Sequence, residues 1–221
     1  ETLAVPSVVY SNDPDLGAFT GRAYAPEEID ELVGGVEDQG ALRACDAVLS
    51  GYIAAQGAGE AVRRAVTRVR ASNPNAFYCC DPVLGDAPKG LAVSRELAEF
   101  VRDRMVAEAE VVTPNCFELG WLTGKPVTTP ATILSAARPL AAKPRFVVIT
   151  GVPTSDRTIG LMLVTPDGGW VASTPKRQFQ RQPSGGGDLT AAVFLAHLLK
   201  MQDPVASLGA TAGSVYAVFA A

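Results

Sequence analysis

Short apolar runs alternate with longer amphipathic stretches through most of this chain. A short apolar run rich in β-branched side chains is typical of a buried strand, and apolar residues spaced three or four apart are typical of a helix. We therefore predict strands at 3–10, 47–50, 76–80, 110–113 and 146–150, and helices at 26–39, 59–71, 94–107, 116–122 and 130–142. This βα order predicts an α/β fold: a mainly parallel, doubly wound sheet with helices on both faces and its ligands beyond the carboxyl ends of the strands.

The pattern changes after residue 150. Apolar runs at 158–164 and 170–173 flank the turn sequence 165–169, which predicts an antiparallel hairpin, and two helical patterns close the chain. No internal repeat or linker interrupts the sequence, so we expect one domain over residues 1–221. The chain begins inside an apolar run and stops inside a helical pattern without a C-cap, so we expect a trimmed chain. The loop at 11–24 is long enough to act as a lid.

Composition narrows the class of protein. A chain of 221 residues that is 48% hydrophobic can bury a large core, and a net charge of −4 with scattered Lys and Arg argues against a nucleic-acid partner. No apolar run is long enough to cross a membrane and the start is unlike a signal peptide, so we expect a soluble, cytoplasmic protein. The four cysteines lack CxxC spacing, which indicates neither a zinc site nor a disulfide framework. For the single histidine, His197, we expect a packing or surface role.

A run of three glycines, Gly185, Gly186 and Gly187, precedes Asp188 and a helical stretch. Glycines let the backbone turn tightly with its N–H groups outward, and the helix adds unpaired first-turn N–H groups and the positive end of its dipole. We therefore expect an anion site. The residue types leave two roles open for Asp188: a cap for the helix, or a proton acceptor beside the anion.

Carboxylates follow two of the predicted strands. Asp81 and Asp86 come after the strand at 76–80, and Glu118 comes after the strand at 110–113, so all three could meet at one edge of the sheet. Oxygen ligands there suit Mg²⁺, which binds through one or two carboxylates plus substrate phosphates. The alternatives are local: Asp81 with the following proline can start a turn, and Asn115 with Glu118 can form a capping box. Together with the glycine turn, the pattern points to a nucleotide-dependent phosphotransferase.

Four motifs in this order and spacing resemble pyridoxal kinases of the ribokinase-like superfamily. They are Cys80-Asp81-Pro82-Val83-Leu84-Gly85-Asp86, Thr113-Pro114-Asn115-Cys116-Phe117-Glu118-Leu119, Ser50-Gly51-Tyr52 and the Gly-x-Gly-Asp of 185–188. The resemblance covers nearly the whole chain, except that the superfamily's first strand is absent. It implies a ribokinase-like fold with a small lid and an ATP- and Mg²⁺-dependent enzyme that phosphorylates the 5′-hydroxyl of pyridoxal.

The resemblance also implies a role for each matching residue. Asp188 would take the proton from the 5′-hydroxyl, with the backbone N–H groups of Gly185, Gly186 and Gly187 stabilising the transferred phosphoryl group. Tyr52 would face the pyridine ring, and Asp81, Asp86 and Glu118 would lie at the metal. The remaining expectations are ATP contacts at Asp81, Thr113, Glu118, Thr150, Thr174, Pro175, Lys176 and Arg177, and substrate contacts at Pro14 and Asp15 in the lid.

The chain departs from the family at the lid. Where family members have Ser-Asn-His-Thr, this chain has Ser11-Asn12-Asp13-Pro14, which replaces a donor and a hydroxyl by a carboxylate and an imino acid. Two other functions therefore stay open: a hydroxymethylpyrimidine kinase, and a non-catalytic protein that binds vitamin B6 or a nucleotide. The family resemblance also implies a homodimer, and it leaves open the preferred B6 vitamer and a monovalent cation.

Overall fold

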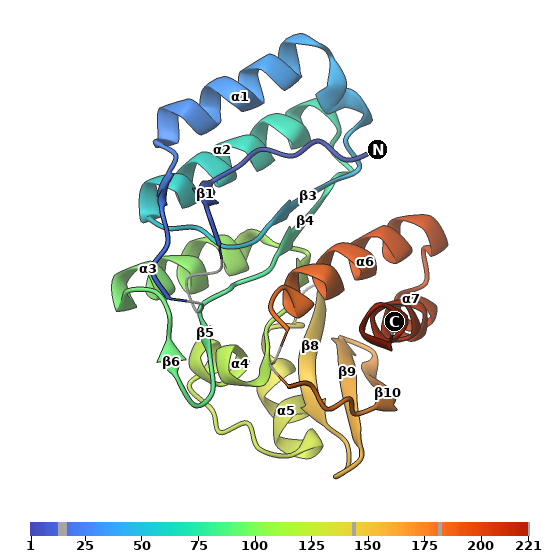
Figure 1. The fold of residues 1–221 in the computed structure, drawn as a ribbon. Helices are drawn as coiled ribbons and strands as arrows, with labels where there is room; N and C mark the ends of the chain where they lie inside the picture. The colour runs from blue at the N-terminus through green and yellow to red at the C-terminus, as the bar shows by residue number, and fades with distance from the viewer. Residues whose placement is uncertain (13–16, 143–144, 181–182, 221) are drawn as a thin grey trace.

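Six strands form the main sheet of the computed structural model, which describes residues 1–12, 17–142, 145–180 and 183–220 (Figure 1). The strand order is β10-β9-β8-β7-β4-β3. β3, β4, β7 and β8 run parallel, whereas β9 and β10 are antiparallel to their neighbours. The bounds are β3 (Ala47–Ser50), β4 (Phe77–Cys80), β7 (Val111–Val112), β8 (Phe146–Pro153), β9 (Thr158–Thr165) and β10 (Gly168–Pro175).

Helices cover both faces of this sheet, which confirms the predicted α/β architecture. Alternate residues of β4 separate the two cores, with Tyr78 facing the layer of α2 and α3 and Cys79 facing Phe194 of α6. Figure 1 shows α6 and α7 on one side and α1 to α3 on the other. The bounds are α1 (Pro26–Asp38), η2 (Ala41–Ala44), α2 (Gln56–Ser72), α3 (Arg95–Phe100), η3 (Val101–Val106), α4 (Cys116–Thr123), α5 (Pro130–Ala137), α6 (Gly186–Met201) and α7 (Pro204–Ala220). Among the described residues, no helix is long and apolar enough to span a membrane.

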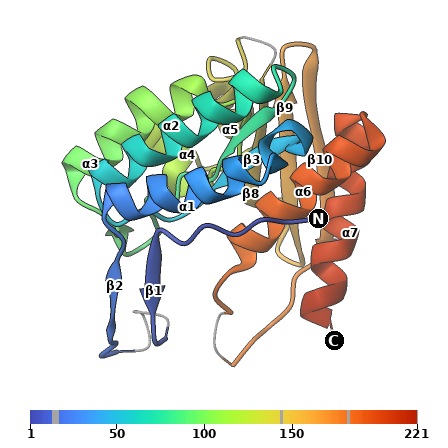
Figure 2. The same ribbon diagram turned by 90° about the horizontal axis from the view of Figure 1, so that it is seen from above.

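The strand predicted at 3–10 is wrong in length and in position. Only β1 (Val8–Tyr10) is extended and paired, and its antiparallel partner is β2 (Gly21–Ala23), which lies inside the predicted lid loop. The two strands form a separate ribbon outside the main sheet (Figure 2). Residues 3–7 form no strand, and Leu3 is 53% exposed. An apolar run forms a strand only where another strand offers hydrogen bonds.

Several boundaries also differ from the sequence prediction. The helix predicted at 94–107 is present but passes from α3 into the π-helical turn η3, and the helix predicted at 130–142 ends earlier, as α5. A short hairpin of β5 (Gly85–Asp86) and β6 (Gly90–Leu91) was not predicted, because two-residue strands carry no periodicity. The hairpin of β9 and β10 is confirmed.

The topology brings the predicted motifs to one edge of the sheet. The parallel strands β3, β4, β7 and β8 end there, and β10 ends there too because it is antiparallel to β9. A β-bulge interrupts the β8–β9 pairing between Ile149 and Val152. It lies at Thr150 and at Gly151, whose φ of +68° favours glycine.

The packing of α2 against α3 can be tested at Gly59 on α2. A methyl group at Gly59 would overlap the ring of Phe100 on α3 and come within 2.9 Å of Ile53. We expect Gly59→Ala to lower the free energy of unfolding by about 1–3 kcal/mol, the usual cost of overpacking. The matched control is Gly35→Ala on α1, where nothing lies within 4 Å and the change should stabilise the helix by about 0.5–1 kcal/mol. Urea unfolding that gives the two variants the same sign would contradict this packing.

Candidate active site

Asp81 follows β4 directly and lies buried at the carboxyl edge of the sheet. Its side chain is within the protein, with the residue only 6% exposed. Burial, together with the negative charges of Glu118 and Asp188, raises the pKa of the Asp81 carboxyl to about 8. A buried carboxylate crowded by two others favours a bound cation.

Glu118 ties the Asp81 loop to the start of α4. Its Oε1 accepts the N–H groups of Leu84 (2.7 Å) and Gly85 (3.4 Å), and its Oε2 accepts the N–H of Asn115 (2.9 Å). Burial raises the pKa of the Glu118 carboxyl, while these backbone donors oppose the rise. The capping box with Asn115 is therefore present, so Glu118 has a structural role whatever else it binds.

Asn115 completes this connection from the other side. Its Oδ1 accepts the N–H of Glu118 (2.9 Å), and its Nδ2 donates to the carbonyl of Gly85 (2.8 Å). Val83 comes just before Leu84 and Gly85, which these hydrogen bonds hold. It has a φ of +45°, a left-handed conformation that costs a β-branched residue energy. The sequence pattern indicates the cap but not the second hydrogen bond, because Gly85 is distant in sequence.

The glycine turn starts α6, as expected for an anion site. Gly185 is the N-cap residue with a φ of +79°, and Asp188 is the third helical residue, so Asp188 does not cap the helix. The Asp188 carboxylate accepts no hydrogen bond from any described residue. An added Cβ on Gly51 would lie 3.6 Å from Asp188 Oδ1, and one on Gly187 would lie 4.0 Å from Asp81 Oδ2. The structure thus brings together Asp81, Asp188, the glycine turn and the end of β3.

Two threonines line the same edge. Thr113 is 2% exposed, and its Oγ1 has no hydrogen-bond partner among the described residues, although its side chain lies close enough to Asp81 to favour the charged carboxylate. Thr150 lies at the bulge of β8, where its N–H donates to the carbonyl of Pro114 (3.0 Å) and it pairs with Asn115. A buried, unpartnered hydroxyl beside Asp81 indicates room for a polar ligand.

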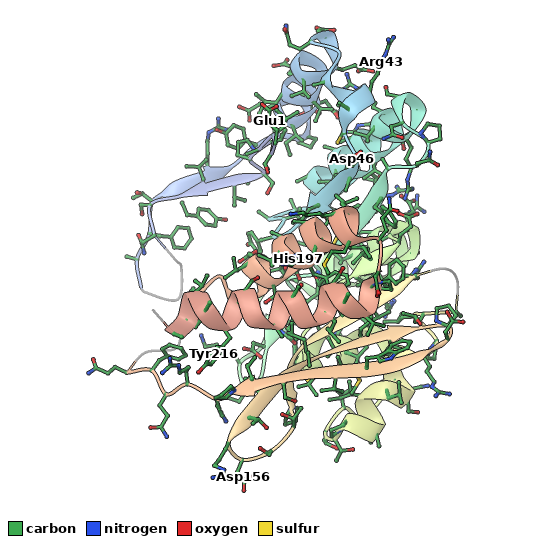
Figure 3. All side chains as sticks on the ribbon, turned by 90° about the vertical axis from the view of Figure 1, so that its right-hand side faces the viewer. Glu1, Arg43, Asp46, Asp156, His197 and Tyr216 are labelled. Carbon is green, nitrogen blue, oxygen red and sulfur yellow. The ribbon has the colours of Figure 1, made fainter. Side chains whose placement is uncertain are left out.

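The residues at the end of β10 and just after it lie in two different places. Thr174 and Pro175 end β10 at the carboxyl edge, and Lys176 is exposed with its N–H bonded to the Arg157 carbonyl (2.8 Å). The guanidinium of Arg177 instead lies on α7, 5.4 Å from the ring centre of Tyr216. Figure 3 labels Tyr216 on α7 and His197 on α6. His197 Nε2 lies 3.3 Å from Ser214 Oγ of α7, so the histidine packs between helices.

Aromatic residues form the other end of the site. Tyr52 follows β3, and burial raises its pKa. Its ring lies 6.5 Å from that of Tyr10 on β1, which in turn lies 4.7 Å from Phe19 (centroid distances). Sequence reasoning missed Tyr10 and Phe19, because the pairing of β1 with β2 brings them together. The expected contacts at Pro14 and Asp15 lie outside the described residues.

The carboxylates fit a metal ion only in part. Asp86 is exposed on β5 and its Oδ1 accepts the N–H of Ala87 (2.8 Å). Within the described part of the chain, no three His, Cys, Asp or Glu side chains are arranged to hold a metal ion by themselves. The raised pKa of Asp81 and the unpartnered Thr113 hydroxyl nevertheless fit a Mg²⁺ ion whose remaining ligands are water and phosphate.

Comparison with known proteins agrees with this geometry. A sequence profile for the family described as phosphomethylpyrimidine kinase matches residues 41–218. The pyridoxal kinase PdxY of Leifsonia xyli subsp. xyli is 40% identical over 224 residues, which cover 100% of this chain and 78% of the relative. The PdxY of Deinococcus radiodurans is 38% identical over 226 residues, which cover 99% of this chain and 76% of that relative.

Solved structures lead to the same class. The pyridoxal kinase of Leishmania donovani in complex with ADP and pyridoxamine superposes with a TM-score of 0.84 at 25% identity, covering 95% of this chain and 73% of that one. The pyridoxal kinase of Entamoeba histolytica, at 17% identity and a TM-score of 0.83, shares the fold and covers 96% of this chain and 75% of its own. Fold and site together define a phosphotransferase of the ribokinase-like class. Within that class, the chain belongs to the pyridoxal kinase family.

Because Asp81 is buried, we expect removal of its charge to raise the thermal stability of the protein, and by more at high pH. Because the folded-state pKa of about 8 lies above the ordinary 3.8, the wild-type protein loses stability as the pH rises from about 4 to about 8, where only the unfolded carboxyl is ionised. Asp81→Asn lacks this loss. With EDTA present, we expect calorimetry to show a higher melting temperature for the variant, by more at about pH 7.5 than at about pH 5.

The matched control for this prediction is Asp156→Asn, which removes an exposed carboxylate in the turn between β8 and β9 (Figure 3). Its melting temperature should follow the wild-type value at both pH values. A gain from Asp156→Asn equal to that from Asp81→Asn, or no gain at Asp81, would contradict a buried, repelled charge at this position.

Proposed function

We propose that this chain transfers the γ-phosphoryl group of ATP to the 5′-hydroxyl of pyridoxal and gives pyridoxal 5′-phosphate. The observation that carries the proposal is the position of Asp188. Its carboxylate has no hydrogen-bond partner among the described residues, and it lies between Gly51 at the end of β3 and the glycine turn of α6. During phosphoryl transfer the attacking hydroxyl must lose its proton. A free carboxylate between the aromatic residues near Tyr52 and the anion site is placed to accept it.

The proposed reaction balances in one step. Asp188 accepts the proton of the 5′-hydroxyl, the hydroxyl oxygen forms a bond to the γ-phosphorus, and the bond from that phosphorus to the β–γ bridging oxygen breaks. ADP leaves with the electron pair of that bond. The N–H groups of Gly185, Gly186 and Gly187 at the start of α6 would stabilise the charge on the transferred group.

The two ends of the site support different parts of the substrate pair. Tyr52 offers an aromatic face to the pyridine ring at the end of β3. At the carboxyl edge, Thr113, Thr150 and the residues that end β10 would contact the nucleotide. The pyridoxal kinase of Leishmania donovani binds ADP and pyridoxamine, which supports an ATP and vitamin B6 pair for this chain.

Mg²⁺ is part of the proposal. Asp81 would hold the ion, with Glu118 acting through water, because both oxygens of Glu118 already accept backbone N–H groups. When bound, the ion neutralises the charge on the β- and γ-phosphates. Asp86 is exposed on β5 and would lie further out.

The two other functions are less well supported. A hydroxymethylpyrimidine kinase would share the glycine turn, but the curated relatives at 38–40% identity are pyridoxal kinases. A non-catalytic binding protein would not require an unpartnered carboxylate at Asp188. A homodimer, which the family resemblance implies, and a cytoplasmic location, which the sequence indicates, remain predictions.

Replacing Asp188 tests the proposed proton transfer. Asp188→Asn keeps the shape but cannot accept the proton, so kcat for pyridoxal should fall by about 10²- to 10⁴-fold, the usual contribution of an acid–base group. The affinity for ATP, measured by calorimetry, should be nearly unchanged. The control is Asp38→Asn, an exposed carboxylate at the end of α1, which should retain wild-type turnover. Full activity in Asp188→Asn would remove this residue from the reaction.

A further inference from the structure

The last turns of α7 contact the glycine turn through an aromatic ring. An added Cβ on Gly186 would lie 3.3 Å from Cζ and 3.6 Å from Cε2 of Phe219. The same ring lies 5.9 Å from that of Phe179 in a T-shaped contact, and Phe179 belongs to the segment that joins β10 to α6. One side chain of α7 therefore touches both the anion site and the segment that leads into it.

A second contact holds this segment to α7. The Arg177 guanidinium lies over the ring of Tyr216, and its Nη2 donates to the carbonyl of Ala220 (3.4 Å) at the end of the helix. A cation at a helix C-terminus is favoured by the dipole and by the unpaired carbonyl groups there. Tyr216 and Phe219 are three residues apart, so they lie on one face of α7. We call Tyr216, Phe219, Arg177 and Phe179 the α7 cluster.

The backbone conformation of Gly186 does not require a glycine. It is the first residue of α6 and does not have a positive φ, so an alanine could adopt its conformation. The nearest obstacle to a side chain is the ring of Phe219. The absence of a Cβ at Gly186 thus lets Phe219 press on the turn whose N–H groups form the anion site.

We propose that Phe219 is a positioning residue that fixes the glycine turn for phosphoryl transfer. This inference rests on the proposed function, because it concerns the same reaction. The N–H groups of the turn stabilise charge only when they point at the transferred group, and a misplacement of about 1 Å can cost about 100-fold in rate. Phe219 lies against Gly186 of the glycine turn and against Phe179, so its effect is on kcat and on the ATP side.

Single substitutions of Phe219 give the first test. Phe219→Ala should lower kcat by about 10-fold and leave KM for pyridoxal unchanged, and Phe219→Leu should be intermediate, since part of the contact remains. Val218→Ala is the matched control, because Val218 is the adjacent residue of α7 and is 58% exposed. Wild-type kcat in a folded Phe219→Ala protein, or an equal loss in Val218→Ala, would overturn the inference.

A double variant separates positioning from a general loss of stability. Gly186→Ala adds a methyl group at the ring and should lower kcat, whereas Gly186→Ala combined with Phe219→Leu should recover part of that loss, because the smaller side chain makes room. If the activity of Gly186→Ala is the same with either residue at 219, the ring does not act through the turn and the inference fails.

The affinity for the non-hydrolysable ATP analogue AMP-PNP tests the inference independently of the reaction. We expect Phe219→Ala to weaken AMP-PNP binding measured by calorimetry, and Val218→Ala to leave it unchanged. A wild-type protein that binds AMP-PNP but phosphorylates no B6 vitamer would overturn the proposed function, and the binding data would still decide the role of Phe219. Unchanged AMP-PNP affinity in Phe219→Ala would overturn the positioning role of Phe219.

Discussion

The site depends on the carboxylate of Glu118. This one group accepts backbone N–H groups from the loop after β4 and from the start of α4, and so it joins two segments that are more than thirty residues apart. A backbone that turns through the strained Val83 needs such a connection, because its N–H groups are buried and require acceptors. Asp81 itself is fixed at the end of β4, where its N–H donates to the Ser50 carbonyl (2.9 Å), and Glu118 fixes the loop that follows it.

The electrostatics follow from this arrangement. The negative charges of Glu118 and Asp188 act on Asp81 at the carboxyl edge, and burial keeps water from screening this repulsion. The start of α6, with its N–H groups and positive dipole end, lies beside Asp81. The buried carboxylate favours a cation, and the N–H groups favour an anion. A metal–phosphate ligand carries charges of both signs and so matches this site.

Much of this could be predicted from the sequence. The βα order predicted the sheet, and the rule that parallel strands end at one edge predicted that Asp81, Asp86 and Glu118 would meet there. The capping box of Asn115 and Glu118 was also visible, because it is local in sequence. Local patterns carry such features whenever the interacting groups are a few residues apart.

The rest required the fold. The strand at 3–10 was overestimated, because its sequence pattern does not say whether a partner strand is present. The second hydrogen bond of Asn115, the aromatic contact between Tyr10 and Tyr52, and the packing of Phe219 on Gly186 all join distant segments. The family resemblance implied an ATP contact at Arg177, and its guanidinium lies against α7.

Phosphoryl transfer from ATP to a vitamin B6 hydroxyl is the reaction proposed for this site. The most direct measurement is ADP release by the wild-type protein with ATP and Mg²⁺, compared among pyridoxal, pyridoxine, pyridoxamine and hydroxymethylpyrimidine, with pyridoxal 5′-phosphate identified by its absorbance. We expect ADP release that depends on a B6 vitamer and equals the amount of phosphate ester formed. Release that requires hydroxymethylpyrimidine instead, or binding of pyridoxal without any turnover, would contradict it.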